Sequence, residues 1–158
     1  MIEHIFIRAP AAQQQTERES VRVLTGRGVE GDRYFDQHDE PGQNITLVEA
    51  EEIERFLQAH GRPQDLSVTG RNLVTRGVRL NEMVGQTFRV GAVTLRGVEL
   101  CEPCLGLGKA LASEALSPAD VVKALVHRAG LRADVVTDGV IAVGDQVRHD
   151  PVAAAQAA

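Results

Sequence analysis

The sequence predicts a mostly β fold in which an antiparallel sheet curls or closes on itself. Two observations lead to this expectation. Short runs rich in Val, Thr, Leu and Phe follow one another closely between residues 87 and 100, with Gly91 as a turn between two of them. Further runs of strand length lie near both ends of the chain, whereas only two segments have the periodicity and capping residues of helices. Several short strands at close spacing are typical of curled or closed antiparallel sheets.

The length allows one substantial hydrophobic core. The chain has 158 residues, of which 43% are hydrophobic, and is short for two domains. We therefore expect a single domain over residues 1–149. Residues 150–158 are rich in alanine and show no amphipathic pattern, which predicts a frayed tail.

The first quarter of the chain alternates between strand-like and loop-like segments. The apolar residues of 2–8 occur on both faces, which predicts a strand covered on more than one side. Polar residues 13–20 predict a loop or hairpin tip, and residues 21–24 a second strand. Three glycines between 26 and 33 predict a loop of the kind that often lies close to a ligand. The polar residues 34–43 predict an exposed loop.

Two helices are expected. Residues 44–48 form a short predicted strand that leads into a helix over 49–57, where the apolar residues have helical spacing and acidic residues fill the first turn. Gly61 and Pro63 are expected to end this helix. The second helix begins at Ser117 as the capping residue, with Pro118 at the first helical position.

The remaining segments have the short apolar runs and turn residues of strands. A stretch over 68–78 mixes glycines, two arginines and an asparagine with apolar residues. Strands are expected at residues 87–90, 93–96, 98–100, 133–137 and 139–147.

Charge and cysteine content limit the classes of function. The formal net charge of −5 disfavours a general nucleic-acid or anionic-membrane binder, and aromatic residues make up only 3% of the chain. No apolar run is long enough to span a membrane, and the N-terminus lacks the pattern of a signal peptide. Two cysteines are not a disulfide framework. We therefore expect a cytoplasmic protein that binds neither nucleic acid nor membrane.

Both cysteines lie in one short segment, Cys101-Glu102-Pro103-Cys104. A reactive cysteine acts as a thiolate, whose pKa is lowered by positive charge, a helix N-terminus or a metal. Because glycines follow Cys104, backbone N–H groups could point toward its sulfur. Buried packing explains a free cysteine equally well. The sequence therefore leaves open whether either thiol is functional.

Metal and redox interpretations of the two cysteines are weaker. Structural zinc needs four ligands, and no second cysteine pair or suitably spaced histidine pair is present. A thioredoxin-like dithiol fits the local Cys-Glu-Pro-Cys pattern, but it belongs to a βαβ setting, whereas the preceding strands are expected to be antiparallel. The acidic and histidine residues Asp36, His38, Asp39 and Glu40 could ligate a metal, although an exposed polar loop explains them more simply.

Arginines provide a candidate anion site. Arg71, with Asn72 beside it, and Arg76 could bind phosphate or carboxylate through the fork of the guanidinium group. A solvated strand edge is the alternative for surface arginines. Asp32 could either meet a ligand or cap the glycine-rich turn.

The order of these segments resembles the MOSC domain, the module at the C-terminus of molybdenum cofactor sulfurases that also occurs as stand-alone bacterial proteins. The most specific part of the resemblance is Pro103-Cys104, placed after Arg71-Asn72-Leu73 and before the ending Gly144-Asp145. The other matching segments are Gly28–Arg33, 44–56, 85–91 and the 128–141 region. Together they cover about residues 1–149 in the same order.

The resemblance implies a β-barrel like that of the pyruvate kinase barrel domain, with peripheral helices. It also implies that Cys104 is the catalytic cysteine, which either carries sulfur as a persulfide or ligates the molybdenum of a bound pterin cofactor. Cys101 becomes its neighbour or a resolving thiol. Thiolate suits both roles because sulfur is a soft ligand and a strong nucleophile.

The resemblance further implies which residues bind the cofactor and which partners are needed. Arg71, Asn72 and Arg76 become candidates for its phosphate or pterin, and Asp32 and Arg33 for the rim of the pocket. The chain has no pyridoxal-phosphate domain, so a sulfur donor such as a cysteine desulfurase is expected; for reduction of N-hydroxylated compounds, an electron-donor protein is expected instead. The alternatives are a non-catalytic module that binds an anionic ligand and a dithiol redox protein using Cys101 and Cys104.

Overall fold

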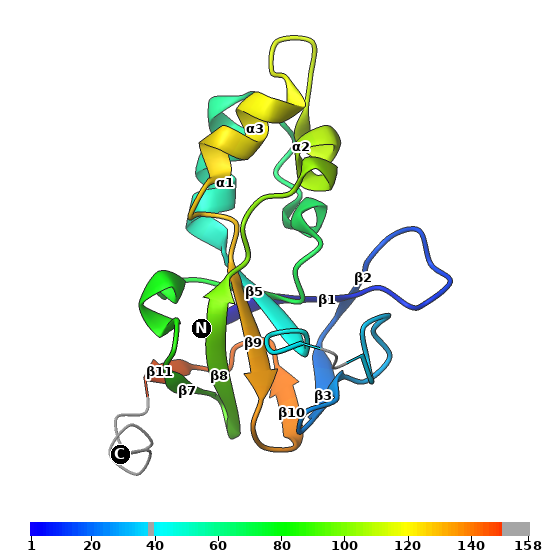
Figure 1. Cartoon of the computed structure of the whole chain (residues 1–158), viewed down its shortest axis with the longest axis vertical. Helices are drawn as coiled ribbons and strands as arrows, with labels where there is room; N and C mark the ends of the chain where they lie inside the picture. The colour runs from blue at the N-terminus through cyan, green and yellow to red at the C-terminus, as the bar shows by residue number, and fades with distance from the viewer. Residues whose placement is uncertain (38–39, 150–158) are drawn as a thin grey trace.

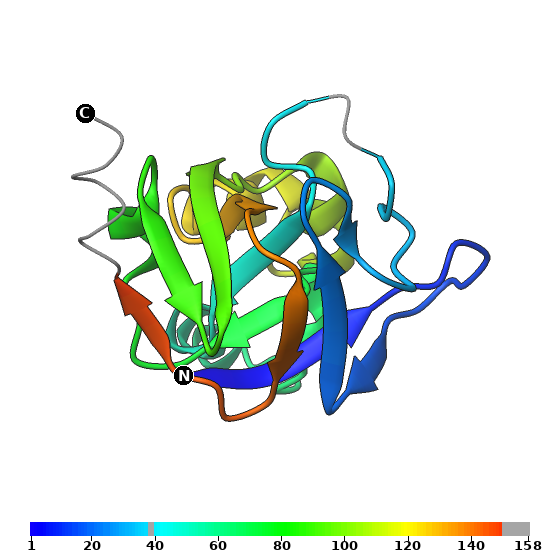
Figure 2. The same ribbon diagram turned by 90° about the horizontal axis from the view of Figure 1, so that it is seen from below.

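The computed structural model describes residues 1–37 and 40–149, and in these residues strands dominate. Eight strands form one strongly curled sheet in the order β11-β7-β8-β9-β5-β6-β1-β2 (Figures 1 and 2). Its members are β1 (Ile2–Ile7), β2 (Thr16–Arg18), β5 (Ile45–Glu49), β6 (Leu73–Thr75), β7 (Thr87–Val90), β8 (Val93–Leu100), β9 (Leu131–Val135) and β11 (Val147–His149). A second sheet, in the order β10-β3-β4, contains β3 (Ser20–Leu24), β4 (Gly28–Val29) and β10 (Gly139–Ala142).

The two sheets enclose the larger hydrophobic core. Side chains from the curled sheet, such as Leu47 and Phe88, pack in the same cluster as Val23 and Ile141 of the smaller sheet. Only Glu19 separates β2 from β3, so the chain passes directly from one sheet to the other. The expected mostly β, barrel-like fold with peripheral helices is therefore confirmed, and the barrel is assembled from two sheets.

One strand pair departs from the expected antiparallel arrangement. β5 and β6 are parallel, with Leu47 opposite Leu73. Parallel neighbours need a crossover connection, and here α1 (Ala50–Ala59) with the 3-10 helix η1 (Leu66–Thr69) supplies it. The other strand pairs in the described residues are antiparallel.

Three helices gather at one end of the molecule, at the top of Figure 1. They are α1, α2 (Leu105–Leu111) and α3 (Pro118–Leu125). Their apolar faces form a second core with the outer side of β5 and β6, to which Val48 and Val74 contribute. Each fully buried Leu or Ile in such a core is worth about 1.5–3 kcal/mol. The helical end is therefore packed firmly against the sheet.

The two expected helices are present, and their ends follow the sequence signals. Ile53, Phe56 and Leu57 are buried on one face of α1. Ser117 caps α3, where its side chain accepts a hydrogen bond from the backbone N–H of Asp120 at 3.2 Å. A second 3-10 helix, η2 (Leu80–Met83), lies between β6 and β7.

Several element boundaries differ from the expected ones. β8 continues through Gly97, which sits at a shift in register, so the strands expected at 93–96 and 98–100 are one. The expected loop at 13–20 contains β2, the short β4 lies within the glycine-rich loop, and β9 begins at Leu131. These segments are short and polar or glycine-containing, and pairing with distant strands determines their conformation.

Helix α2 was not expected because Gly106 and Gly108 disfavour helix. A Cβ at position 108 would lie 2.6 Å from the carbonyl oxygen of Pro118. The missing side chain therefore lets α2 pack closely against the start of α3. Tertiary packing outweighs propensity here, and it places the N-terminus of α2 directly after Cys104.

Among the described residues, no helix combines the length and the apolar character that crossing a membrane requires. The expected tail over 150–158 lies outside the described residues. So do His38 and Asp39.

Candidate functional site

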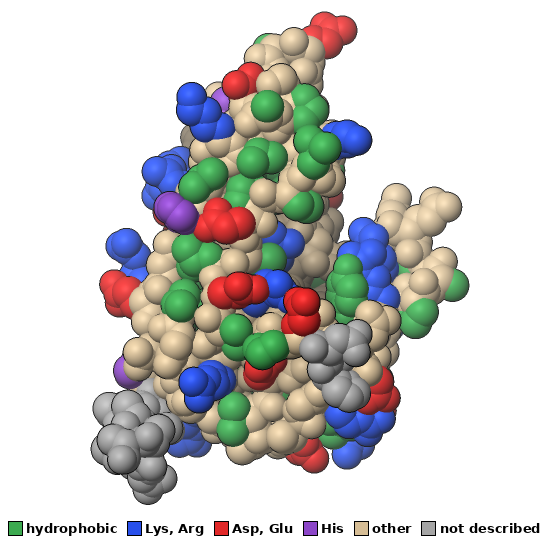
Figure 3. All heavy atoms as spheres, in the orientation of Figure 1, with side chains coloured by type: hydrophobic (Ala, Val, Ile, Leu, Met, Phe, Trp, Pro, Cys, Tyr) green, Lys and Arg blue, Asp and Glu red, His purple; other side chains and the backbone are tan. Residues whose placement is uncertain are grey.

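A cleft of about 1130 Å³ opens beside the helical end of the barrel. In the space-filling view the surface is recessed between the helical end and the lobe to its right, with basic side chains at the edge (Figure 3). The walls come from the loop after β1, the loop after β4, the segment from η1 to β6, the end of β8, and α2. Six of the seven residues predicted for the site line it: Asp32, Arg33, Arg71, Asn72, Cys101 and Cys104.

Cys104 is the exposed thiol of the cleft. It occupies the N-cap position of α2 with an extended backbone. The backbone N–H of Leu107 and, to a lesser extent, that of Gly106 approach its sulfur and lower the pKa of the thiol, and the nearby Arg71 guanidinium adds to this effect against a cost of partial burial. The approach falls short of a true cap hydrogen bond. Cys104 is therefore the thiol that ionises more readily.

Cys101 has the opposite character. It is half-buried, and burial raises the pKa of its thiol, although Arg71 and Arg132 partly oppose that rise. Its backbone N–H donates to the carbonyl oxygen of Gly130 at 2.8 Å. The two thiols therefore differ in exposure and in ionisation.

Arg71 is held in place beside the cysteine segment. Its Nε donates to the carbonyl oxygen of Ala129 at 2.9 Å, and its Nη2 to that of Cys101 at 3.4 Å. These bonds orient the guanidinium along the floor of the cleft. A fixed cation at this position stabilises a thiolate and can also meet an anionic ligand.

Asn72 and Asp32 line the cleft, but their polar atoms form hydrogen bonds with other groups of the protein. The Asn72 side chain accepts from the backbone N–H of Thr46 at 3.1 Å and donates to the carbonyl oxygen of Phe6 at 3.2 Å. Asp32 is 7% exposed and accepts from the backbone N–H groups of Arg8 at 2.9 Å and Tyr34 at 3.1 Å. Both side chains therefore shape the cleft by joining its loops.

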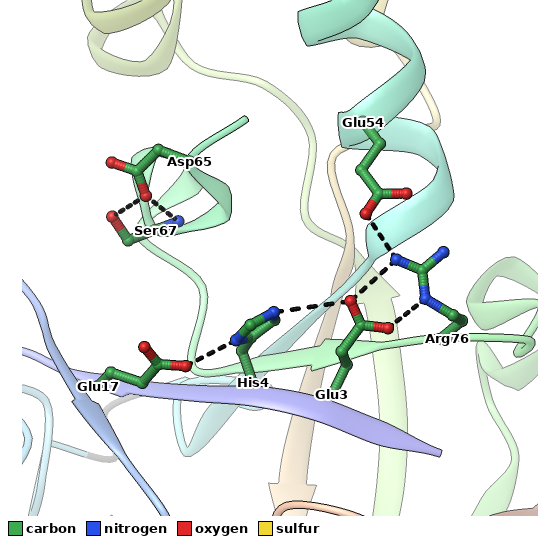
Figure 4. Close-up of polar contacts among 7 residues, drawn as sticks. All are labelled: Glu3, His4, Glu17, Glu54, Asp65, Ser67 and Arg76. Atoms are coloured by element: carbon green, nitrogen blue, oxygen red, sulfur yellow. Dashed lines mark hydrogen bonds and ion pairs between the residues drawn. The ribbon is translucent and has the colours of Figure 1, made fainter. Parts of the chain in front are cut away.

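Arg76, the seventh predicted residue, lies elsewhere. Figure 4 shows its guanidinium between the carboxylates of Glu3 and Glu54; its Nη2 donates to Glu54 at 2.6 Å and its Nε pairs with Glu3. The same network continues from Glu3 to His4 and from His4 to Glu17. Arg76 does not line the cleft, and its contacts tie α1 to β1.

Some cleft residues carried no signal in the sequence. Arg8 and Gln15 lie on the N-terminal loop, and Arg132 lies on β9 where its Nη1 donates to Glu99 at 2.7 Å. These residues come from segments far apart in the chain. Only the strand pairing brings them to one cleft, so a single sequence could not reveal them.

Glu102 anchors the cysteine segment from its other side. Its carboxylate accepts from the backbone N–H of His127 at 3.0 Å and contacts Nδ1 of the same residue at 2.7 Å. Partial burial raises the pKa of Glu102, but the hydrogen bonds from His127 outweigh this effect and keep the pKa below its usual value. His127 has a left-handed backbone, with φ of 62°. Glu102 thus fixes the turn that follows α3 against the cysteine segment.

We expect Glu102→Ala to lower the free energy of unfolding by about 1 kcal/mol, since the pair is substantially exposed to solvent. The midpoint of urea denaturation at pH 7 measures this loss. Glu102→Gln is the control: its amide oxygen still accepts from the His127 N–H, so most of the stability should remain. An alanine variant as stable as the wild type would show that the anchor contributes nothing.

No group of three or more His, Cys, Asp and Glu side chains in residues 1–37 and 40–149 is arranged to hold a metal ion. The predicted metal ligand Cys104 therefore belongs to no such group in these residues.

A comparison with family models identifies the family of this chain. The family model of the MOSC domain matches residues 35–148. No curated protein sequence gave a significant match. In structure the chain is similar to the YuaD protein from Bacillus subtilis, with a TM-score of 0.78, 18% identity and 92% of both chains covered.

Two further solved structures are similar. They are YiiM from Geobacillus stearothermophilus (TM-score 0.71, 17% identity, 95% of this chain and 74% of that chain) and YiiM from Escherichia coli (TM-score 0.64, 15% identity, 95% and 70%). At these identities the likeness shows the fold. The family match covers more than half of the chain and includes the strand and segment that carry Cys104. The chain belongs to the MOSC domain family.

Proposed function

We propose that this protein is a sulfur-handling MOSC protein, in which Cys104 carries a sulfane sulfur as a persulfide for a molybdenum pterin cofactor. The observation that carries the proposal is an exposed thiol with a lowered pKa on the wall of a large cleft that also presents Arg71. Thiolates with these surroundings are the reactive cysteines of proteins.

The loading step is a simple exchange between sulfur atoms. The Cys104 thiolate attacks the terminal sulfur of a persulfide on a donor such as a cysteine desulfurase. A new S–S bond forms at Cys104, the S–S bond of the donor breaks, and the donor leaves as a thiolate. No electrons are gained or lost overall. Exposure of Cys104 allows a protein donor to reach it, and the neighbouring N–H groups stabilise the attacking thiolate.

The size and the charged lining of the cleft support a bound cofactor in this proposal. The cleft volume of about 1130 Å³ exceeds the usual 300–1,000 Å³ of ligand pockets, so a large ligand can be held beside Cys104. Arg71 is placed to meet an anionic group, and Arg33 also lines the cleft. When bound, the cofactor would supply a molybdenum centre, for which thiolate sulfur is a suitable ligand. Arg76 is no part of this proposal because two carboxylates engage it.

A second candidate assigns Cys104 as a protein ligand to the molybdenum, in an enzyme that reduces N-hydroxylated compounds. The size of the cleft favours it, because space remains for a substrate beside the cofactor. This activity would need an electron-donor protein. The lowered pKa of Cys104 suits both candidates, since metals also bind the thiolate.

The test uses protein purified from a host grown with ample molybdenum, as wild type, Cys104→Ser and Cys101→Ser. The carrier role predicts cyanide-releasable sulfur in wild type and Cys101→Ser, and none in Cys104→Ser. Metal ligation predicts molybdenum that is lost with the same variant. If neither sulfur nor molybdenum depends on Cys104, the proposal fails. A reversible Cys101–Cys104 disulfide at a physiological potential would then favour a dithiol redox protein.

A further inference from the structure

Of the three arginines of the cleft that pair with no carboxylate among the described residues, Arg71 already donates to backbone carbonyl oxygens, which leaves two beside the cleft. Arg8 and Arg33 both line it, and neither forms an ion pair with a carboxylate among the described residues. By contrast, Arg132 in the same cleft pairs with Glu99. Arg8 and Arg33 also precede the part of the chain that matches the MOSC family model, residues 35–148, so that match assigns them no role.

The backbone holds Arg8 and Arg33 side by side. The N–H of Arg8 donates to the Asp32 carboxylate at 2.9 Å, and the N–H of Arg33 donates to the carbonyl oxygen of Arg8 at 2.7 Å. The Arg33 guanidinium lies over the ring of Tyr34, 4.6 Å from its centre. A stacked guanidinium keeps the N–H groups along its edge available for an acceptor. The backbones of both arginines and the guanidinium of Arg33 are thus held in place at this wall.

Two polar atoms on this wall are buried and have no partner. One is Nε of Arg8, a charged donor, and the other is Oε1 of Gln15. Buried polar atoms are nearly always hydrogen-bonded, and an unpaired one costs free energy. The Gln15 amide can meet a donor with its oxygen or, turned over, an acceptor with its nitrogen. Both atoms belong to residues that line the cleft.

We infer that Arg8, Arg33 and Gln15 form an oxyanion subsite that takes a phosphate or carboxylate group of the ligand. Asp32 directly precedes Arg33 in the chain, and its oxygens already accept from N–H groups of Arg8, Tyr34 and Asn72. The subsite therefore presents positive charge to the cleft. It goes beyond the sulfur chemistry proposed for Cys104 and does not depend on it. The oxyanion belongs either to the phosphate of the cofactor or to a substrate bound next to it.

The first experiment measures binding of inorganic phosphate by calorimetry to protein freed of cofactor. Wild type should bind, and Arg8→Gln and Arg33→Gln should each bind at least about tenfold more weakly, because each removes charge-assisted hydrogen bonds. Arg89→Gln is the matched control: Arg89 is exposed on β7 and outside the cleft, so its loss should leave the affinity unchanged. Arg8→Lys retains the charge but lacks Nε and the fork, so it should also bind weakly.

Urea denaturation without phosphate checks that each variant is folded. The inference is overturned if wild type binds no phosphate, or if the arginine variants bind it as tightly as wild type does. Cys104→Ser should retain full phosphate affinity, so failure of the sulfur proposal would leave this result unaffected. Repeating the titration on cofactor-loaded protein identifies the source of the oxyanion. Lost binding shows that the cofactor phosphate occupies the subsite, and retained binding shows that the cofactor leaves the subsite free for a substrate group.

Discussion

Iodoacetamide should alkylate Cys104 at least about ten times faster than Cys101 at pH 7. The reagent reacts with accessible thiolates, and the two thiols differ both in pKa and in exposure to solvent. Cys104 is exposed and approached by the backbone N–H of Leu107, which lowers its pKa, whereas burial raises the pKa of Cys101. Cys104 therefore has the larger thiolate fraction at neutral pH and the freer access.

The measurement uses Cys101→Ser and Cys104→Ser proteins, each with one remaining thiol. With rising pH, the rate for Cys104 should level off below the pH expected of an ordinary thiol, whose pKa is about 8.5, and the rate for Cys101 above it. Guanidinium chloride should abolish the difference, because it depends on the fold. Equal rates in the folded proteins would contradict the assignment of Cys104 as the reactive sulfur.

The fold was largely predictable because its strands carry local signals. Val21, Val23 and Ile141 occupy alternating or central positions in short apolar runs, and each run is a strand in the structure. The parallel pair β5 and β6 could not be predicted in the same way. Its direction depends on how α1 carries the chain between two strands, and that is a property of the whole topology.

The site was predictable where its chemistry is contiguous in the chain. Cys101 and Cys104 lie in one segment, and Arg71 with Asn72 in another, so the residue types alone drew attention to them. Arg8 gave no such signal. It lies beside Asp32 and Arg33 because the loops after β1 and β4 meet, and the pairing of β1 with β6 brings Asn72 to the same place.

Arg76 lies outside the cleft, although it was predicted as part of the same site as Arg71. It lies five residues after Arg71, which made the two arginines look like one anion site. β6 runs between them, and five residues of extended chain separate their backbones by roughly 17 Å. Arg71 therefore reaches the cleft, and Arg76 emerges at the other end of the strand beside Glu3 and Glu54. The sequence gives the spacing of two residues along the chain. Only the structure shows that these two arginines lie at opposite ends of a strand.

Gly130→Ala should lower the free energy of unfolding by about 3 kcal/mol or more. Gly130 has φ of 117°, which side chains rarely adopt, and a Cβ there would lie 2.1 Å from the carbonyl oxygen of Leu47. That oxygen belongs to β5 in the middle of the curled sheet, so it cannot move aside cheaply. The midpoint of urea denaturation measures the loss. Gly144→Ala is the matched control, since its φ is 93° but no atom lies within 4 Å of the added Cβ.

The control should lose only about 1 kcal/mol, from backbone strain alone. The difference between the two variants then reports the collision with β5.

The Gly130→Ala substitution should also disturb the site. The carbonyl oxygen of Gly130 accepts a hydrogen bond from the backbone N–H of Cys101, and that of the adjacent Ala129 accepts one from Arg71. In the fraction of Gly130→Ala protein that remains folded, Cys104 should therefore lose part of its alkylation advantage over Cys101. If Gly130→Ala were as stable as Gly144→Ala, the turn at Gly130 would not approach β5 as closely as described. The turn would then also not support the cysteine segment in the way proposed.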